Sequence, residues 1–158
     1  MTRALHPNAR RVADALTEAG VDSTVRELPE PATTAAQAAA QLGVELGAIA
    51  NSLVFAADGE PVLVLASAAH RVDTNLVARL LGASTLDRAD RELVRAATGY
   101  PIGGVAPVGH PRRLHTLVDT ALAPYPVVWC GAGTPHTVFP TSYPELLRIT
   151  GGRPAEVA

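Results

Sequence analysis

Apolar residues recur at helical spacing in several parts of the chain. Ala9, Val12 and Leu16 share one face of a helix that starts at Pro7 and stops before Gly20. Four further helices are predicted from capping residues, terminating glycines or the same spacing. They cover residues 35–42 (with Thr33 or Thr34 as the N-cap), 74–81, 88–98 (after an Asp87 cap) and approximately 144–150.

Between these helices lie short apolar runs that are typical of strands. "SLVFAA" and "PVLVLAS" flank "DGE", which predicts a β-hairpin with its turn at Asp58 and Gly59. Further strands are expected over 114–119 and 125–131, with an extended stretch at 136–140 and an edge strand at 23–28. Because strands and helices alternate irregularly, we expect an α/β (α+β) fold: a single domain, residues 1–158, with a curved mixed β-sheet surrounded by helices.

Composition narrows the class of protein. The chain has 158 residues, of which 47% are hydrophobic and 18% charged, as in a compact domain rather than a disordered chain. The apolar run at 61–69 is about half as long as a membrane-spanning helix requires. The N-terminal residues lack the apolar core of a signal peptide, so we expect a cytoplasmic protein without membrane contact.

The charged residues limit the chemistry. All 13 basic residues are arginines, so no lysine serves as a nucleophile, base or phosphate ligand. The net charge of −2 excludes a protein that coats nucleic acid but not one that binds an RNA end locally. Candidates for such a contact are Arg112 and Arg113, and Arg88, Arg91 and Arg95 on the predicted helix; the alternative for each is a solvated surface charge.

No side chain stands out as a nucleophile or metal ligand. Cys130 follows Trp129 in a strand pattern and is expected to be a buried structural thiol. The five histidines do not show the spacing of a metal site, and we predict none. The chain also lacks a G-x-S-x-G elbow and a phosphate-binding P-loop.

One loop, "GYPIGGVAPVGHP" at 99–111, concentrates glycine and proline. Gly103 and Gly104 permit backbone conformations that other residues avoid, and Pro107 stiffens the far side. Such a loop can direct successive N–H groups into one concavity, where they would bind an anion or a carbonyl oxygen that gains charge. A tight connection at a sheet corner explains the same residues equally well.

The order of motifs resembles a known family. "TTAAQAAAQLGVELGAIANSLVF", "DTNLVARLLGAS", "TGYPIGGVAPVG", "LVDTAL" and "GAGTPHTVFPTSYPELLRITGG" are similar to the YbaK/EbsC proteins, relatives of the editing insertion domain of bacterial prolyl-tRNA synthetases. The resemblance runs from about residue 7 to the end of the chain. It implies a deacylase that hydrolyses the ester of a mischarged tRNA, such as Cys- or Ala-tRNA(Pro), without a metal or organic cofactor. The implied partners are the tRNA 3′ end and, in some systems, a synthetase.

The resemblance also assigns residues. It implies that the segment from Gly103 to Pro107 lines the pocket and that its backbone N–H groups hold the substrate, while water or a substrate group attacks. We therefore predict a catalytic set and a substrate-binding set. The catalytic set is Asn51, Gly103, Gly104, Val105, Ala106 and Pro107. The substrate-binding set is Ser52, Tyr100, His110, Arg112, Arg113, Asp119, Gly133 and His136. For Asp119, a role in the site and a role as a turn cap stay open.

The sequence departs from the family pattern at three places. Asn51-Ser52 stands where many members have Lys-Thr, Thr74-Asn75 stands in another segment that commonly carries lysine, and the arginine of a later G-x-R-G segment is missing from 131–136. Two hypotheses therefore stay open. One is an editing deacylase in which Asn51 orients the ester, and the other is a weak or inactive member that binds a tRNA end or an amino-acid-like ligand. The amino acid, the tRNA and the choice between monomer and homodimer are not determined by the sequence.

Overall fold

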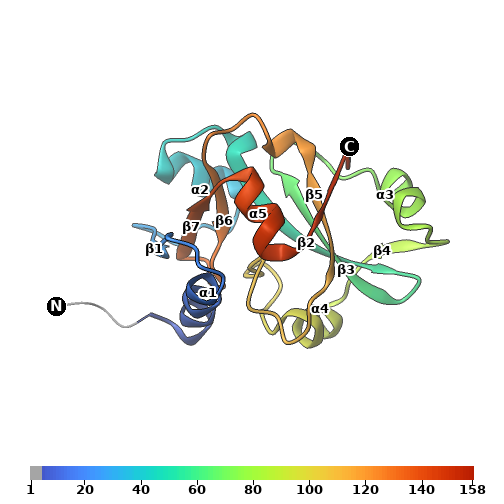
Figure 1. Ribbon diagram of the computed structural model, residues 1–158, viewed down its shortest axis with the longest axis horizontal. Helices are drawn as coiled ribbons and strands as arrows, with labels where there is room; N and C mark the ends of the chain where they lie inside the picture. The colour runs from blue at the N-terminus through green and yellow to red at the C-terminus, as the bar shows by residue number, and fades with distance from the viewer. Residues whose placement is uncertain (1–4) are drawn as a thin grey trace.

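A mixed β-sheet forms the centre of the structure, a computed structural model that describes residues 5–158 (Figure 1). Within that range its eight strands are β1 (Arg26–Glu27), β2 (Ile49–Ala57), β3 (Glu60–Ser67), β4 (Leu86–Arg88), β5 (His115–Asp119), β6 (Val128–Gly131), β7 (Thr137–Thr141) and β8 (Arg153–Ala155). The order across the sheet is β1-β7-β6-β2-β3-β5-β8, and β4 pairs with β2 outside this path. Parallel and antiparallel pairs both occur, which confirms the expected mixed sheet.

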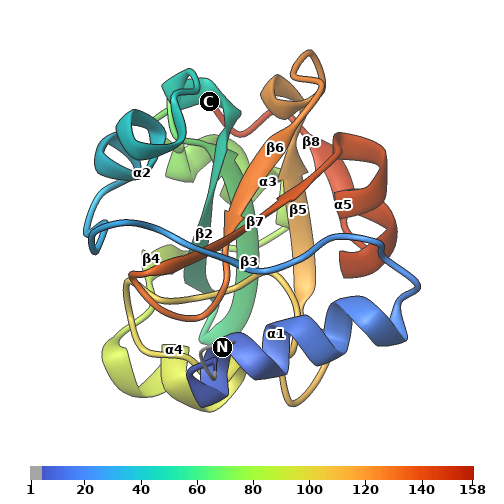
Figure 2. The same cartoon turned by 90° about the vertical axis from the view of Figure 1, so that its left-hand side faces the viewer.

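Five α-helices surround this sheet within the described range: α1 (Pro7–Glu18), α2 (Ala35–Leu42), α3 (Thr74–Leu81), α4 (Arg91–Thr98) and α5 (Tyr143–Thr150). Two short 3-10 helices, η1 (Leu46–Ala48) and η2 (Thr120–Leu122), precede β2 and follow β5. The view in Figure 2 shows α1 running below the sheet, α5 beside it and α2 at the opposite side. No helix of residues 5–158 is long and apolar enough to cross a membrane.

Local signals placed several of these elements correctly. The β2–β3 hairpin turns at Asp58 (φ 49°) and Gly59 (φ 87°), the left-handed pair that a two-residue turn requires. The Thr34 hydroxyl accepts the Gln37 N–H at the start of α2, and the Asp73 carboxylate caps α3. Gly43 and Gly82 end these two helices in the left-handed conformation. Hydrogen bonds between near neighbours in sequence therefore fix these boundaries.

The predicted helix over 88–98 starts too early. Asp90, not Asp87, caps α4 by accepting the Leu93 N–H at 2.8 Å. Residues 86–88 instead form β4, which pairs antiparallel with the end of β2. The free edge of β2 offers hydrogen bonds that outweigh one more helical turn, and as a result Arg88 does not share a helix with Arg91 and Arg95.

Two strand predictions also need correction, and one strand was missed. The edge strand expected over 23–28 is only β1, and the strand expected from 125 begins at Val128. The last strand, β8, was not predicted, because three residues are too few to show an alternating pattern. It pairs with β5 in parallel, so its pairing depends on a partner distant in sequence.

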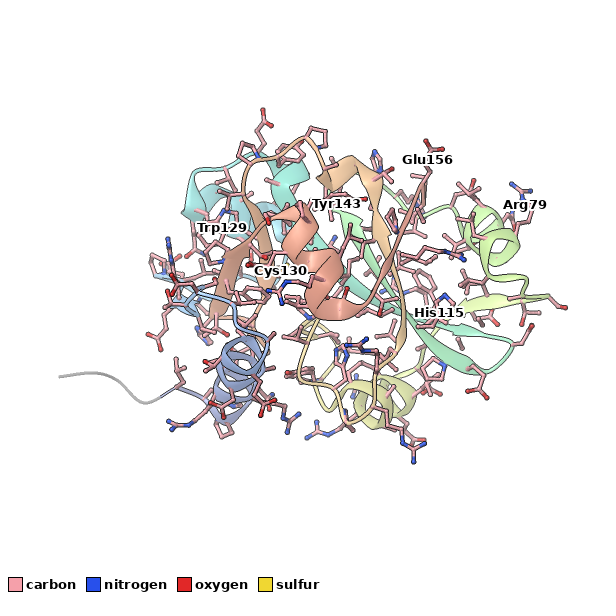
Figure 3. The ribbon with its side chains drawn as sticks, in the orientation of Figure 1. Arg79, His115, Trp129, Cys130, Tyr143 and Glu156 are labelled. Atoms are coloured by element: carbon pink, nitrogen blue, oxygen red, sulfur yellow. The ribbon has the colours of Figure 1, made fainter. Side chains whose placement is uncertain are left out.

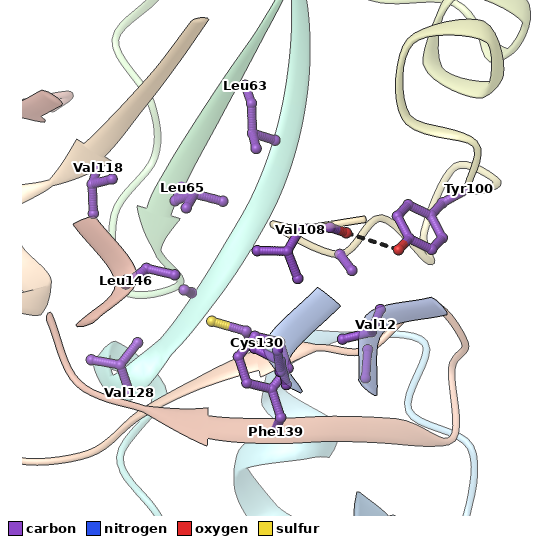
Figure 4. Close-up of a cluster of buried hydrophobic side chains, with 14 of the residues drawn as sticks. Val12, Leu63, Leu65, Tyr100, Val108, Val118, Val128, Cys130, Phe139 and Leu146 are labelled. Carbon is purple, nitrogen blue, oxygen red and sulfur yellow. Dashed lines mark hydrogen bonds between the residues drawn. The ribbon is translucent and has the colours of Figure 1, made fainter. Parts of the chain in front are cut away.

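The described residues contain three buried apolar clusters. One lies where α1, α4 and α5 meet the sheet, and it includes Leu16 and Val94. Figure 4 shows part of this cluster, with Val12, Phe139 and Leu146 labelled. A second packs α3 on the sheet through Val77, and a third packs α2 on β2 and β6 through side chains that include Trp129. The sheet is therefore covered on both faces, and a cavity within it would be sheltered from bulk water.

A buried carboxylate joins three of these elements. Asp119, at the end of β5, is 1% exposed. It accepts hydrogen bonds from the Ser67 N–H at the end of β3 (3.0 Å) and from the Ala121 N–H in η2 (2.9 Å). Its Oδ2 also lies 3.1 Å from Nδ1 of His70. This arrangement makes Asp119 part of the frame that fixes the end of the β3–β5 pair.

We predict that Asp119→Ala lowers the free energy of unfolding by about 2–4 kcal/mol, because the buried Ser67 N–H and the half-buried Ala121 N–H lose their acceptor. Denaturant unfolding measures the loss. Asp22→Ala, at an exposed aspartate, is the matched control and should change stability by less than about 0.5 kcal/mol. Equal stability of the two variants would contradict the structural role.

Candidate functional site

One edge of β2 is paired only at its two ends, and a cavity of about 300 Å³ lies beside the unpaired middle part. On this edge β2 pairs with β6 at Ile49 and Ala50 and with β4 at 55–57. Residues 51–54 have no strand beside them there among the described residues. The cavity lies between α2, the start of α4, the 99–111 loop and the segment 129–138. Its volume is at the small end of ligand pockets, which span about 300–1,000 Å³.

The β2 wall of the cavity is polar where the rest of the strand is apolar. Asn51 and Ser52 line it. Within residues 5–158 the Asn51 amide has no hydrogen-bond partner, and Ser52 Oγ is buried without one. Since an unsatisfied buried hydroxyl costs about 1–3 kcal/mol, Ser52 is positioned to bond a group that enters the cavity.

The loop predicted from its glycines supplies the facing wall. Gly103 and Val105 line the cavity. Residues 101–104 form a type II β-turn in which the Gly104 N–H donates to the Pro101 carbonyl at 3.0 Å and Gly103 has φ 84°. The N–H groups of Gly103 and Val105 have no acceptor within the described chain.

A second glycine segment packs against this loop, backbone to backbone. A Cβ added at Gly104 would lie 3.2 Å from the Gly133 carbonyl oxygen, and one added at Gly131 would lie 3.6 Å from the Val105 carbonyl oxygen. The Gly133 carbonyl also accepts a hydrogen bond from the Asn8 amide of α1 at 3.3 Å. Small residues therefore let two main-chain segments meet beside the cavity.

The loop is held by two rings, the buried Tyr100 and the half-buried His110. The Tyr100 hydroxyl donates to the Val108 carbonyl at 2.8 Å (Figure 4), and Nε2 of His110 lies 2.7 Å from the Ala106 carbonyl. Burial raises the pKa of Tyr100 to about 12 and lowers the pKa of His110. At neutral pH the phenol therefore keeps its proton and the neutral imidazole donates from Nε2–H. Together the two bonds tie residues 106 and 108 to the loop's two ends.

The side chains that line the cavity carry almost no charge. The lining side chains are apolar, hydroxyl or amide groups, and Arg88 is the single charged residue among those described. Cys130, beside Trp129 in Figure 3, is buried, and burial raises the pKa of its thiol to about 12. The described residues contain no cluster of histidine, cysteine and carboxylates that could hold a metal ion. The cavity thus offers hydrogen bonds and shape rather than a charged acid, base or nucleophile.

The structure brings together some of the residues predicted from sequence. Asn51, Ser52, Gly103 and Val105 line the cavity. The following residues lie next to that wall and support it: Gly104, Ala106, Pro107, Tyr100 and Gly133.

Other predicted residues lie outside the cavity. Arg112 and Arg113 line a separate shallow hollow together with His110, on the far side of the loop. Asp119 belongs to the frame described above, and His136 is exposed and does not line the cavity.

Sequence reasoning did not place several lining residues in the site, including Trp129, Thr134 and Thr137. The signals that pointed to the site were the glycine loop and the family resemblance, in which Asn51-Ser52 stands where many members have Lys-Thr. Nothing in the sequence showed which strands lie beside that pair.

Comparison with known proteins is consistent with this geometry. The sequence model of the family described as "aminoacyl-tRNA editing domain" matches residues 29–149. This range contains both walls of the cavity that β2 and the 99–111 loop supply. The chain belongs to the aminoacyl-tRNA editing domain family. The resemblance noted in the sequence is thereby confirmed.

Proteins that are similar to this chain include two proline–tRNA ligases and a protein of known crystal structure. A proline–tRNA ligase of Nitratidesulfovibrio vulgaris is 37% identical over 101 residues, covering 63% of this chain and 18% of the ligase. The proline–tRNA ligase of Geobacter sulfurreducens is 30% identical over 123 residues, which cover 72% of this chain and 21% of the ligase. The chain therefore spans about a fifth of these relatives. A crystal structure of a candidate trans-editing enzyme for prolyl tRNA synthetase superposes with a TM-score of 0.93 and 42% identity over 98% of each chain.

We predict that Tyr100→Phe loosens the loop of this editing domain. Loss of the hydroxyl leaves the Val108 carbonyl unpaired, so stability falls by about 1 kcal/mol and the amides of residues 103–108 exchange faster with deuterium. Hydrogen exchange measures the effect. Tyr125→Phe is the control, because the Tyr125 hydroxyl donates no hydrogen bond within residues 5–158. Unchanged exchange in Tyr100→Phe would show that the bond does not hold the loop.

Proposed function

We propose that this protein hydrolyses the ester that joins a wrong amino acid to the 3′ end of a tRNA. Family membership supports an editing role, and the cavity geometry supports the reaction. The observation that carries the proposal is the pair of unpaired N–H groups, at Gly103 and Val105, in the wall of a nearly neutral cavity. Such donors stabilise the oxygen of an acyl group as it gains negative charge.

In the proposed reaction, the ester carbonyl oxygen accepts hydrogen bonds from these two N–H groups. A water molecule attacks the carbonyl carbon, the bond from that carbon to the ribose oxygen breaks, and a proton from the water ends on the ribose hydroxyl. The products are the free amino acid and the uncharged tRNA. Because an aminoacyl ester is already activated, positioning and charge stabilisation suffice without a protein nucleophile.

The remaining polar residues of the wall orient the substrate. The Asn51 amide can donate to an ester or ribose oxygen, and Ser52 Oγ can bond the aminoacyl group. The named relatives support a proline tRNA as the substrate and a prolyl-tRNA synthetase as partner. Cys and Ala are the amino acids that the family resemblance implies. The reaction would take place in the cytoplasm, where tRNAs are charged.

The direct test is a panel of mischarged tRNAs incubated with the purified, folded protein. We expect at least one to lose its amino acid faster than in buffer, and Gly103→Ala to slow that reaction by about tenfold to a hundredfold, because φ 84° is strained for alanine and the N–H groups shift.

Gly59→Ala is the matched control, since Gly59 has φ 87° in the hairpin turn and has similar open space around it. It should lose similar stability but keep full activity. No deacylation of any tRNA by the folded wild type would refute the proposed function.

Asn51→Lys separates this proposal from an inactive binding module. If Asn51 orients the ester, lysine at this place should lower kcat/KM of the active wild type, because a longer, charged side chain replaces the amide in a nearly neutral cavity. Activity that appears only in Asn51→Lys, from an inert wild type that still binds a tRNA end, would support the binding module instead.

A further inference from the structure

Arg88 is a charged residue in an otherwise neutral wall. Of the described residues that line the cavity, it alone carries a charge, and it is exposed to solvent. No carboxylate pairs with it within residues 5–158. The cavity therefore has one uncompensated positive charge, and it lies where the lining meets solvent.

The strand β4 fixes the position of this charge. Arg88 lies opposite Phe55 in the β2–β4 pair, and its guanidinium lies 5.7 Å from the centre of the Phe55 ring. The next residue, Ala89, donates its N–H to the Val54 carbonyl at 3.1 Å. Arg88 is thus attached on both sides of its backbone to the strand that forms the cavity wall, which reduces the entropy lost when it binds an anion.

A second exposed residue of the lining complements this charge. Ile102, in the 99–111 loop, is 54% exposed although its side chain is large and apolar. An exposed apolar group and an unpaired cation at the opening of one cavity suit a ligand that carries a flat apolar group next to an anion. The last nucleotides of an RNA chain have this chemistry.

We propose that Arg88 and Ile102 form a rim that binds the terminal nucleotides of the substrate, with the Arg88 guanidinium on the last phosphodiester and Ile102 against the terminal base. This inference rests on the proposed function. It adds that the protein binds the terminal nucleotides of the substrate as well as the reacting ester. It differs from the expectation that Arg112 and Arg113 make the contact, because those two residues line another hollow.

Three esters of the same amino acid test the rim: an ethyl ester, the 3′-ester of adenosine, and the 3′-ester of the dinucleotide cytidylyl-adenosine. Only the dinucleotide contains a phosphodiester. Arg88→Gln should lower kcat/KM for the dinucleotide ester by about tenfold to a hundredfold, as expected for loss of one charge-assisted hydrogen bond, and leave the adenosine ester unchanged. Ile102→Ser should slow both nucleoside esters but not the ethyl ester.

Arg91→Gln is the matched control. Arg91 is exposed, lies three residues away and does not line the cavity, so all three esters should react as with the wild type. With the dinucleotide ester, Arg88→Gln should also reduce the salt dependence of kcat/KM, whereas Arg91→Gln should not. Thermal unfolding of each variant establishes that the fold is intact.

The outcomes are distinct. A wild type that hydrolyses none of these esters and no aminoacyl-tRNA would refute the proposed function itself. If the wild type is active and Arg88→Gln lowers kcat/KM by the same factor for the adenosine and dinucleotide esters, the phosphate contact is wrong. Arg88 would then act on a part of the substrate that both esters share. Equal values of kcat/KM for Arg88→Gln and the wild type on the dinucleotide ester would also overturn the phosphate contact.

Discussion

Among residues 5–158, the strand β2 has a different neighbouring strand at each end of one edge and none in the middle, and the candidate site depends on this interruption. A sheet edge presents main-chain hydrogen-bonding groups, which a neighbouring strand normally satisfies. Here β6 and β4 diverge, and the loop, α2 and α4 close the space between them. The result is a cavity inside the sheet, held by pairings on both sides rather than placed on a mobile surface.

The same constraint explains why the facing wall is made of backbone. The space beside β2 is narrow, and Gly104 and Gly131 allow two chain segments to approach it closely. Tyr100 and His110 then hold two carbonyls of the loop, and the N–H groups of Gly103 and Val105 have no partner within residues 5–158. Donors fixed in this way need little reorganisation when charge develops on a bound oxygen, which is the condition for electrostatic catalysis.

Sequence patterns predicted the parts of the molecule that short-range contacts determine. The Asp58–Gly59 turn and the caps at Thr34 and Asp73 depend on residues a few positions away. The turn and the Asp73 cap were predicted correctly, and Thr34 was one of the two caps expected for its helix. The strands β4 and β8 depend on pairing with β2 and β5, which are distant in sequence, and neither was predicted.

The site shows the same division. The glycine loop was recognisable in the sequence because its composition is unusual, and the pair Asn51-Ser52 because it departs from the pattern of the family that the chain resembles. The place of Arg88 was not, because the helical spacing that seemed to join it to Arg91 continues across the boundary between β4 and α4. Asp119 was ambiguous for a related reason: a carboxylate after a strand can cap a turn or serve a site, and only the tertiary structure shows which N–H groups it accepts from.

The central claim is that the backbone of the loop binds the reacting carbonyl. The measurement that tests it most directly is a structure of the protein with a non-hydrolysable analogue, an aminoacylated 3′-amino-3′-deoxyadenosine in which an amide replaces the ester. Our account predicts that the carbonyl oxygen of the analogue lies about 3 Å from the backbone nitrogen of Gly103 or Val105. An analogue bound with its carbonyl oxygen away from both nitrogens, or bound outside the cavity, would contradict it.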